Sequence, residues 1–517
     1  MKLAFKYIVL ILLISVKARA GEVLFQCNSF YYTNGEDLKA VVYFNNLAAN
    51  GKVLRLELVD DSLNLIDAFY AKVEGSRAEI NYTIPYQMIS GNKKIYVSGT
   101  SNDGEVIDII ASSIFIFNTT DKERKLNFEY DASPLKPHSY DLFKWNQSGN
   151  SYNFQKVNEG SLVSNLLCDA SYGEEPNINI VENITQTTID KISNKIIVRG
   201  MVSLNGKPSK QDILGIYRIS KDSFLYAKSD VDGKFHFRLD DFSNYEEFQF
   251  LPSNLPSAKL KFELLQSTFR NRKIYTIHKS SNLLSPMYDE YKKKNIFKLY
   301  FNEASEITNT ATVYKNKFNL KPQKKYKPAN YNKFEYFYQF CKENNAPLRF
   351  ELKDNKYHAS VFIAGYYAKK FEIVVDYPIF MIDGKLTRNY DAIARLKVED
   401  IELIEIFTDV DELRKMYSAF GKETFIKLSL KNGKNLLSKL EQENTLSFKG
   451  FIINDSKKML DIQREGPDFS QIIHWSVDDK HENFNVKENG IKGGKILHTV
   501  FTDKQGKIRL SSLKINE

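Results

Sequence analysis

The side chains in this sequence that could do chemistry are few, and most of them are acids. An apolar run, Ile379–Ile382, ends abruptly in Asp383-Gly384, as a buried strand does when it leads into a catalytic carboxylate or when it turns. Four more acids follow close together: Glu399, Asp400, Glu402 and Glu405. Paired carboxylates do acid–base work only when burial separates their pKa values. The four later acids lie where a short helix passes into a strand, so we expect them to be solvated. At Asp383-Gly384 we expect a turn rather than a catalytic carboxylate, because Asp and Gly are turn-forming residues.

The other reactive groups are isolated. The seven histidines are scattered singly, and His474, beside Trp475, is the most suggestive of them. The sequence has no His-Glu-x-x-His or His-x-x-Glu pair, no Gly-x-Ser-x-Gly elbow and no phosphate-binding glycine loop. Asp230 and Asp232 could hold Ca²⁺, but two carboxylates fall far short of an oxygen cage. We therefore expect no enzyme, no catalytic, cofactor-binding or metal site, and no cofactor.

The cysteines give no further chemistry. Cys27, Cys168 and Cys341 are far apart, allow one disulfide at most and lack metal-ligand spacing. Free cysteine behaves as a small buried hydrophobe, so core thiols are expected, with one disulfide as the alternative.

The first twenty residues have the pattern of a secretory signal peptide. Lys2 and Lys6 precede an apolar core, Tyr7–Val16, and Ala18-Arg19-Ala20 is a small-x-small cleavage site. A membrane-spanning helix needs ~20 apolar residues, and no stretch comes close, so no transmembrane helix is expected. Removing the leader takes four positive charges from the formal net charge of +9 and leaves +5. That mild balance predicts solvated lysine faces and no nucleic-acid partner.

Most of the remaining chain has the pattern of β structure. Short runs of Val, Ile, Tyr, Phe and Thr alternate with Gly and Asn turns. A chain of 517 residues is too long for one ordinary core. We therefore predict a mainly β, multidomain protein, with β-sandwich modules in series plus one α+β domain.

Residues 21–120 give the clearest sandwich pattern. After a turn at Asn34-Gly35, alternate residues from Leu38 to Phe44 share one strand face. Val53–Val59 alternates again, with Arg55 and Glu57 expected to point outward. The spacing fits a β-sandwich of about 95 residues.

The same segment resembles the macroglobulin-like domain of bacterial envelope proteins. The matching positions, in chain order, are Tyr32, Gly35, Glu36, Leu56, Leu58, Pro85 and Gly91. The Cys-Gly-Glu-Gln thioester of macroglobulin protease traps is missing, so the resemblance implies a spacer or contact module.

Residues 191–258 form a second clear β unit. In Ser229–Leu239 (SDVDGKFHFRL), Asp232-Gly233 supplies the positive φ of a tight hairpin, and Phe235, Phe237 and Leu239 alternate into a core. The segment resembles the carboxypeptidase regulatory-like domain, a small β-sandwich. Phe501–Leu510 (FTDKQGKIRL) repeats the pattern and predicts another hairpin, in a C-terminal β domain over residues 441–517.

Two segments are less regular. Residues 121–190 contain several prolines and weak periodicity, and they predict either a divergent β domain or a linker. Residues 259–328 predict a β and helical connector, with a helical stretch at Pro286–Glu303 and a basic linker at Leu320–Pro328.

Residues 329–440 predict the α+β domain. Asn332 can cap a helix with Glu335 at the capping-box position, whose apolar face carries Phe334, Phe337, Tyr338 and Cys341. Strands are expected at Leu348–Leu352, Ser360–Ile363, Phe371–Val375, Ile379–Ile382, Ile401–Thr408 and Thr424–Leu430, with a short helix at Asp391–Leu396.

This domain resembles the plug of TonB-dependent outer-membrane receptors. The matching pieces are Asp383-Gly384, Val398–Phe407, Tyr417–Gly421 and Phe425–Gly433. Only 83 residues follow Lys434. A receptor barrel has about 22 strands of ~10 residues, so this chain is not expected to be the transporter itself.

The order of modules resembles exported Bacteroidota-type envelope proteins. It implies a periplasmic or outer-membrane-associated protein of a Gram-negative bacterium. We expect a non-enzymatic accessory or docking component that works with an outer-membrane β-barrel in transport or secretion, through exposed strand edges. The alternative is a stand-alone glycan- or peptide-binding protein, and an enzyme with an unrecognised site is the third.

Overall fold

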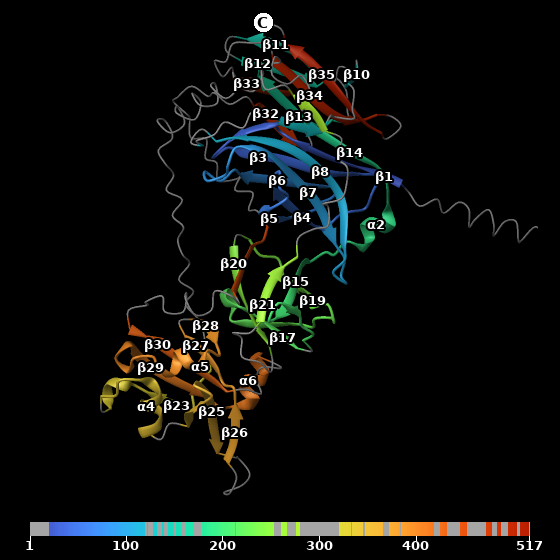
Figure 1. The fold of residues 1–517 in the computed structure, drawn as a ribbon. Helices are drawn as coiled ribbons and strands as arrows, with labels where there is room; N and C mark the ends of the chain where they lie inside the picture. The colour runs from blue at the N-terminus through green and yellow to red at the C-terminus, as the bar shows by residue number, and fades with distance from the viewer. Residues whose placement is uncertain are drawn as a thin grey trace, which may run out of the picture.

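The computed structural model of this chain is mostly β, with its strands in several separate sheets. Figure 1 shows them as a row of four units: a terminal sandwich, a first sandwich, a middle sandwich and a mixed module, from top to bottom. The predicted mainly β, multidomain fold class is confirmed. The structure describes residues 20–118, 121, 128–131, 137–138, 143–148, 151–156, 161–168, 177–211, 213–243, 245–252, 260–265, 276–279, 320–331, 333–344, 347–364, 372–382, 384–417, 424–431, 445–451, 472–477, 483–487, 495–503 and 507–515.

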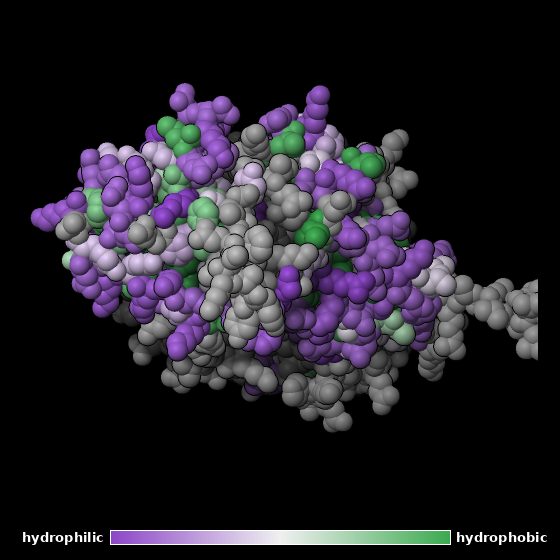
Figure 2. Space-filling model, turned by 90° about the horizontal axis from the view of Figure 1, so that it is seen from below, coloured by the Kyte–Doolittle hydropathy of each residue, from purple (hydrophilic) through white to green (hydrophobic). Residues whose placement is uncertain are grey.

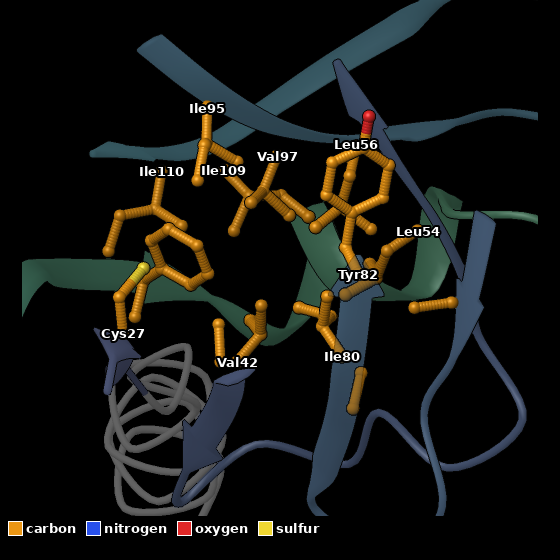
Figure 3. Packing of buried hydrophobic residues seen from close by; sticks show 14 of the residues in the cluster. Cys27, Val42, Leu54, Leu56, Ile80, Tyr82, Ile95, Val97, Ile109 and Ile110 are labelled. Atoms are coloured by element: carbon orange, nitrogen blue, oxygen red, sulfur yellow. The ribbon is translucent and has the colours of Figure 1, made fainter. Parts of the chain in front are cut away.

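The first sandwich has two facing sheets. In spatial order, one contains β14 (Ile178–Thr185), β1 (Ala20–Cys27), β3 (Asp37–Asn45) and β6 (Arg77–Thr83). The other contains β2 (Tyr31–Thr33), β8 (Val106–Phe117), β7 (Gly91–Thr100), β4 (Val53–Val59) and β5 (Leu65–Lys72). Figure 3 shows side chains of both sheets, among them Cys27, Val42 and Val97, meeting in the core. Leu38, Ala40, Val42 and Phe44 are all buried, as the alternation predicts.

The middle sandwich follows a short helix, α2 (Gln186–Lys191). One of its two sheets contains, in spatial order, β16 (Lys207–Pro208), β15 (Ile196–Leu204) and β19 (Lys234–Leu239). A fourth strand of this sheet, β21 (Leu260–Leu264), also pairs with β15. Its other sheet contains β18 (Ser223–Ala227), β17 (Leu214–Arg218), β20 (Tyr245–Pro252) and β31 (Thr445–Lys449), and the turn η1 (Ile219–Lys221) joins β17 to β18. Phe235, Phe237 and Leu239 are buried as predicted.

The mixed module combines two sheets with short helices. The larger sheet contains β23 (Lys324–Tyr326), β29 (Ile401–Phe407), β30 (Phe425–Leu430), β27 (Ile379–Ile382) and β28 (Lys385–Thr387). The smaller contains β24 (Leu348–Lys353), β25 (Lys356–Ala364) and β26 (Glu372–Asp376). The helices and turns are α4 (Phe337–Glu343), α5 (Tyr390–Ala394), α6 (Val410–Tyr417), η4 (Pro328–Asn330) and η5 (Val398–Asp400). Each strand predicted for this domain overlaps an observed one.

The terminal sandwich is built from two distant parts of the chain. One sheet contains β10 (Pro137–His138), β35 (Ile508–Ile515), β34 (Lys495–Thr502), β13 (Ser161–Cys168) and β32 (Ile472–Val477). The other contains β11 (Phe143–Ser148), β12 (Ser151–Lys156) and β33 (Asn483–Lys487). A separate pair joins β9 (Phe128–Asp131) to β22 (Thr276–Lys279). Strand pairing therefore crosses the expected division into domains 121–190 and 441–517.

The helix predicted from Asn332 begins later than expected. Its first residue is Phe337, and the Tyr336 N–H donates to Oε1 of Gln339 at 3.1 Å. Tyr336 is extended because the chain here pairs with a neighbouring segment: the Phe337 N–H donates to the Leu396 carbonyl, and the Val398 N–H donates to the Glu335 carbonyl. A helix that starts at Phe337 contradicts the start and capping box predicted from Asn332 and Glu335, and Asn332 itself lies outside the described residues. Phe337 and Cys341 are buried as the pattern required.

The basic linker predicted at Leu320–Pro328 is partly a strand. β23 pairs antiparallel with β29, and Lys325 forms an ion pair with Glu405 at 3.1 Å. A lysine-rich segment suits this edge because β29 carries acidic side chains, and one of them, Glu405, lies beside Lys325. The helix α6 was not predicted, and the helical stretch predicted at Pro286–Glu303 lies outside the described residues.

The surface seen from the mixed-module end is mainly hydrophilic. Figure 2 shows hydrophobic residues there as scattered spots. Among the described residues, no helix is both long and apolar enough to cross a membrane.

Candidate functional site

A candidate site lies where the first and middle sandwiches meet, at β31. This strand is far along the chain from its partner β20, yet it adds to the edge of β20 in antiparallel register. Lys449 lies opposite Tyr245, and Phe448 lies opposite Glu246. We call β31 together with Gly450 and Phe451 the added strand. Its four last residues, Phe-Lys-Gly-Phe, each have a distinct contact.

Phe448 fills an aromatic pocket of the middle sandwich. Its ring stacks on Phe248 with centroids 4.4 Å apart, and it meets the ring edges of Phe242 at 5.9 Å and Phe237 at 6.4 Å. Arg218 closes the pocket, since it forms a two-pronged ion pair with Glu246 at 2.5 and 2.8 Å and lies over the Phe242 ring. Burying a Phe side chain contributes roughly 1.5–3 kcal/mol.

Lys449 enters an aromatic cage that belongs mainly to the first sandwich. Its Nζ lies 4.9 Å from the Tyr82 ring centroid, 5.4 Å from that of Tyr245 and 5.8 Å from that of Phe69. The Asp67 carboxylate is 3.5 Å away and completes the cage. Ring faces within about 6 Å attract a cation, and the attraction grows as water is excluded. The cage therefore has the composition that recognises an ammonium group.

Gly450 and Phe451 carry the added strand across to the first sandwich. The Tyr70 N–H of β5 donates to the Gly450 carbonyl at 3.1 Å, and the Phe451 N–H donates to the Phe242 carbonyl at 2.8 Å. A Cβ on Gly450 would lie 2.2 Å from the Phe242 carbonyl oxygen, so this position has no room for another side chain. The added strand thus bonds to both sandwiches through its backbone.

A cavity of about 390 Å³ adjoins the added strand. It lies between the edges of β5 and β6, and Phe69, Tyr70 and Phe451 supply its aromatic lining. Two ion pairs lie in its wall, Lys72 with Asp241 at 2.7 Å and Arg77 with Glu79 at 2.8 Å, and Glu74 also lines it.

Of Arg55 and Glu57, both expected to point into solvent, Glu57 is buried at this junction and Arg55 is mostly covered. Their ion pair is 2.7 Å long, and the Glu57 side chain is 2% exposed. Arg55 and Arg199 line one narrow space with Ile197 of the middle sandwich. The outward prediction is wrong because a second module covers that face of β4, which alternation within one strand cannot reveal.

The middle sandwich also packs tightly against the mixed module. The side-chain amide of Gln249 accepts a hydrogen bond from the Leu386 N–H at 2.7 Å and donates one to the Leu386 carbonyl at 3.2 Å. It therefore pairs with β28 as one residue of a neighbouring strand would. The Asp222 carboxylate accepts hydrogen bonds from the hydroxyls of Tyr217 at 2.7 Å and Tyr417 at 3.3 Å. Burial raises the pKa of Asp222, although these two hydroxyl bonds oppose the shift.

The acids singled out from the sequence do not converge. Glu399, Asp400 and Glu402 are exposed, whereas Glu405 is held by Lys325 at 3.1 Å and Lys427 at 3.8 Å. β27 and β28 form a hairpin in which Ile382 pairs with Lys385, and Gly384 has a φ of +85°. The turn prediction is confirmed by this pairing; Asp383 itself lies outside the described residues.

The two predicted hairpin motifs share one pair of hydrogen bonds at the base of the turn. Asp230 exchanges two bonds with Lys234, at 2.8 and 2.9 Å, and Asp503 makes the same two bonds with Lys507, both at 2.9 Å. Asp232 lies 3.6 Å from the Lys234 ammonium. Within the described residues, no group of three His, Cys, Asp or Glu side chains could hold a metal ion.

The remaining candidates have structural surroundings. Cys27 and Cys341 are free, buried thiols, and burial raises the pKa of each. Cys168 lies in β13 and His474 in β32 opposite Leu166, but their side chains are outside the described part. The added strand and its cage were missed by sequence reasoning, because Asp67, Tyr82, Tyr245 and Lys449 come from distant segments and share no local motif.

Comparisons with known proteins give weak likenesses. No protein-family model and no curated protein matches the chain. Among solved structures, it is similar to a tetra-tandem repeat from the extending region of a large adhesion protein, at 7% identity and a TM-score of 0.16 over 95% of this chain and 98% of that one. It is similar to trypsin-activated alpha-2-macroglobulin from Escherichia coli, at 8% identity and a TM-score of 0.22 over 96% of this chain and 41% of that one. It is also similar to Salmonella alpha-2-macroglobulin reacted with methylamine, at 8% identity and a TM-score of 0.22 over 96% of this chain and 39% of that one.

The chain thus spans about two fifths of the length of these two macroglobulins.

Proposed function

We propose that this chain is a non-enzymatic cell-envelope protein, a rigid row of β modules that docks with a partner through strand addition. It is exported and acts in the periplasm or at the outer membrane of a Gram-negative bacterium. The resemblance of the mixed module to receptor plugs suggests an outer-membrane β-barrel as the partner, in transport or secretion. The macroglobulin-like and carboxypeptidase regulatory-like resemblances suggest contact or spacer modules.

The observation that carries the proposal is that successive modules share buried contacts. Leu24 and Val41 of the first sandwich pack with Val500 and Leu510 of the terminal sandwich in one cluster. Another cluster joins Tyr217 and Leu251 of the middle sandwich to residues of the mixed module, including Phe407 and Leu413. Interfaces with apolar cores resist relative motion, and a rigid row holds a docking edge at a fixed distance from its far end.

One edge of the mixed module suits docking. β28 is capped by Gln249, and the edge strand β23 carries Lys324 and Lys325, which discourage pairing with another chain. The edge strand β24 also carries charged side chains, but Lys353 forms an ion pair with Glu351 at 2.9 Å, and Arg349 donates to the Cys341 carbonyl. Between them β24 presents Leu352, whose exposed fraction is 58%. An extended partner segment can add beside β24, with Leu352 as an apolar contact.

A photo-crosslinking amino acid at Leu352 tests this proposal. In detergent-solubilised outer membranes, the Leu352 position should crosslink to a β-barrel at defined stoichiometry. Val231, 76% exposed on a hairpin of the middle sandwich, is the matched control and should not crosslink. A chain that stays monomeric, gives no Leu352-specific product and binds only soluble polymers would rule the barrel partner out.

The cavity beside the added strand favours a second candidate, a stand-alone peptide- or glycan-binding protein. Its 390 Å³ volume and aromatic lining fit a short segment of either polymer. Calorimetric titration with soluble peptides and oligosaccharides distinguishes the candidates, because binding at this cavity would be lost in Arg77→Glu and kept in Leu352→Lys.

A further inference from the structure

We propose that the junction of the first and middle sandwiches is an acceptor site for an extended aromatic-lysine-glycine-aromatic segment of a partner protein. In the isolated chain the added strand occupies this site and keeps it closed. The acceptor site consists of the β20 edge, the Phe448 pocket, the Lys449 cage and the Phe242 carbonyl. This acceptor site and the β24 edge lie in different sheets.

The pairing itself is independent of sequence. Backbone bonds along β20 and at Tyr70 would hold any extended segment, as in other cases of strand addition. Specificity must therefore come from the side chains, and the acceptor site contacts them at successive positions.

The first position selects an aromatic ring. The pocket around Phe448 is made of three rings, one of them stacked at 4.4 Å, so a smaller side chain leaves a void between Phe248 and Phe242. Voids of this kind in an apolar pocket lose both transfer and packing energy.

The second position selects a cation. Three ring faces and the Asp67 carboxylate surround the Lys449 ammonium, whose side chain is 20% exposed beside an Asp67 side chain that is 14% exposed. An acidic side chain at this position would meet Asp67 and the negative faces of the rings, so it is repelled twice.

The third position excludes any residue except glycine. The backbone of the segment passes so close to the Phe242 carbonyl that a Cβ would lie 2.2 Å from its oxygen. The Phe451 N–H then bonds to the same carbonyl, so the segment cannot move away without losing this bond. Charge complementarity at the second position and steric exclusion at the third together require a partner segment in which lysine is followed by glycine.

The chain's own strand is a competitor with the advantage of being tethered. An intramolecular ligand acts at an effective concentration that can reach the millimolar range, so the wild-type site should be largely closed to a free peptide. Weakening the added strand should open the site without altering the acceptor side chains.

The test uses a fluorescent peptide with the sequence of residues 445–451 and the full-length chain. The double variant Phe448→Ala/Lys449→Ala weakens the added strand, and fluorescence anisotropy should show it binding the peptide at least about tenfold more tightly than the wild type. Peptides with lysine replaced by glutamate, or glycine by alanine, should bind this variant at least about tenfold more weakly. Circular dichroism checks that each protein is folded.

The single variant Lys449→Ala provides a second acceptor if the double variant does not fold. Equal binding of the peptide to wild type and to the folded variant, or no binding to either, would overturn the proposal. So would a glutamate peptide that binds as well as the lysine peptide, since the cage would then select nothing. The β24 edge is intact in both variants, so failure here leaves the proposed function untouched.

Discussion

At the scale of single residues, the chain buries several polar groups where strands or modules meet. His498 in β34 is fully buried, with Nδ1 2.8 Å from the Ser512 hydroxyl and Nε2 without a hydrogen-bond partner. Burial lowers the pKa of His498 from 6.5 to about 4. The neutral ring is therefore the form that the folded terminal sandwich accepts.

His498 should make the terminal sandwich sensitive to acid. The pKa of His498 is lower in the folded protein than in the unfolded chain. Its contribution to the free energy of unfolding is therefore fully present above pH 6.5 and is lost as the pH falls toward about 4. The loss should reach roughly 3 kcal/mol. Both tryptophans, Trp145 and Trp475, lie in this sandwich, so urea unfolding followed by tryptophan fluorescence at pH 7 and 4.5 measures it.

Two variants decide whether His498 is responsible. His498→Leu cannot titrate, so its stability should lose most of this dependence on pH. His236 in β19 is exposed, and His236→Gln should keep the wild-type dependence. If His498→Leu loses as much stability between pH 7 and 4.5 as the wild type does, other groups cause the effect.

At the scale of elements, edges of sheets in this molecule are completed by remote groups. β31 completes one sheet of the middle sandwich, β14 completes one of the first sandwich, and the Gln249 amide caps β28. Unpaired backbone groups at a buried edge are costly, so each of these completions stabilises a junction between parts of the chain.

Two glutamine-to-leucine variants should have effects of opposite sign. Gln249→Leu leaves both backbone groups of Leu386 unpaired at a buried interface, which costs about 2–4 kcal/mol. Gln26 is also fully buried, but neither polar atom of its side chain has a partner, so Gln26→Leu should stabilise the first sandwich by about 1–2 kcal/mol.

Hydrogen exchange measures both effects locally. Protection of β27 and β28 should fall in Gln249→Leu, and protection of β1 should rise in Gln26→Leu. Equal destabilisation by both substitutions would mean that leucine is simply too poor a fit at either site.

At the scale of the whole molecule, the added strand is what should keep the first and middle sandwiches in one relative orientation. It bonds to β20 on one side and to Tyr70 of β5 on the other. Ile89 on the first sandwich and Val231 on the middle sandwich are exposed and can carry spin labels.

The distribution of distances between these two labels should be narrow in the wild type and broad in Lys449→Glu. The glutamate replaces the ammonium beside Asp67 with a like charge, so the strand should detach from the cage. Double electron–electron resonance measures the distribution. Labels at Ile66 and Ile89, both in the first sandwich, should give the same distribution in both proteins; a broadening of this pair would indicate unfolding of the sandwich instead.

Much of the local structure follows from the sequence alone. Alternation placed Leu38, Ala40, Val42 and Phe44 in a core, and Asp-x-x-Gly-Lys motifs predicted two hairpins that share one set of turn bonds. The turn at Gly384 and the buried run before it were likewise readable, because side-chain period and positive φ are properties of a few neighbouring residues.

Tertiary structure alone decided which face of a strand is covered and which segments lie side by side. The covering of Arg55 and Glu57, the late start of the helix α4, and the joining of β13 to β34 each depend on a segment far away in the chain. The Lys449 cage depends on several such segments at once. Local patterns carry no record of these partners, since hydrophobic burial and strand pairing are satisfied by any neighbour of suitable chemistry, whatever its distance along the sequence.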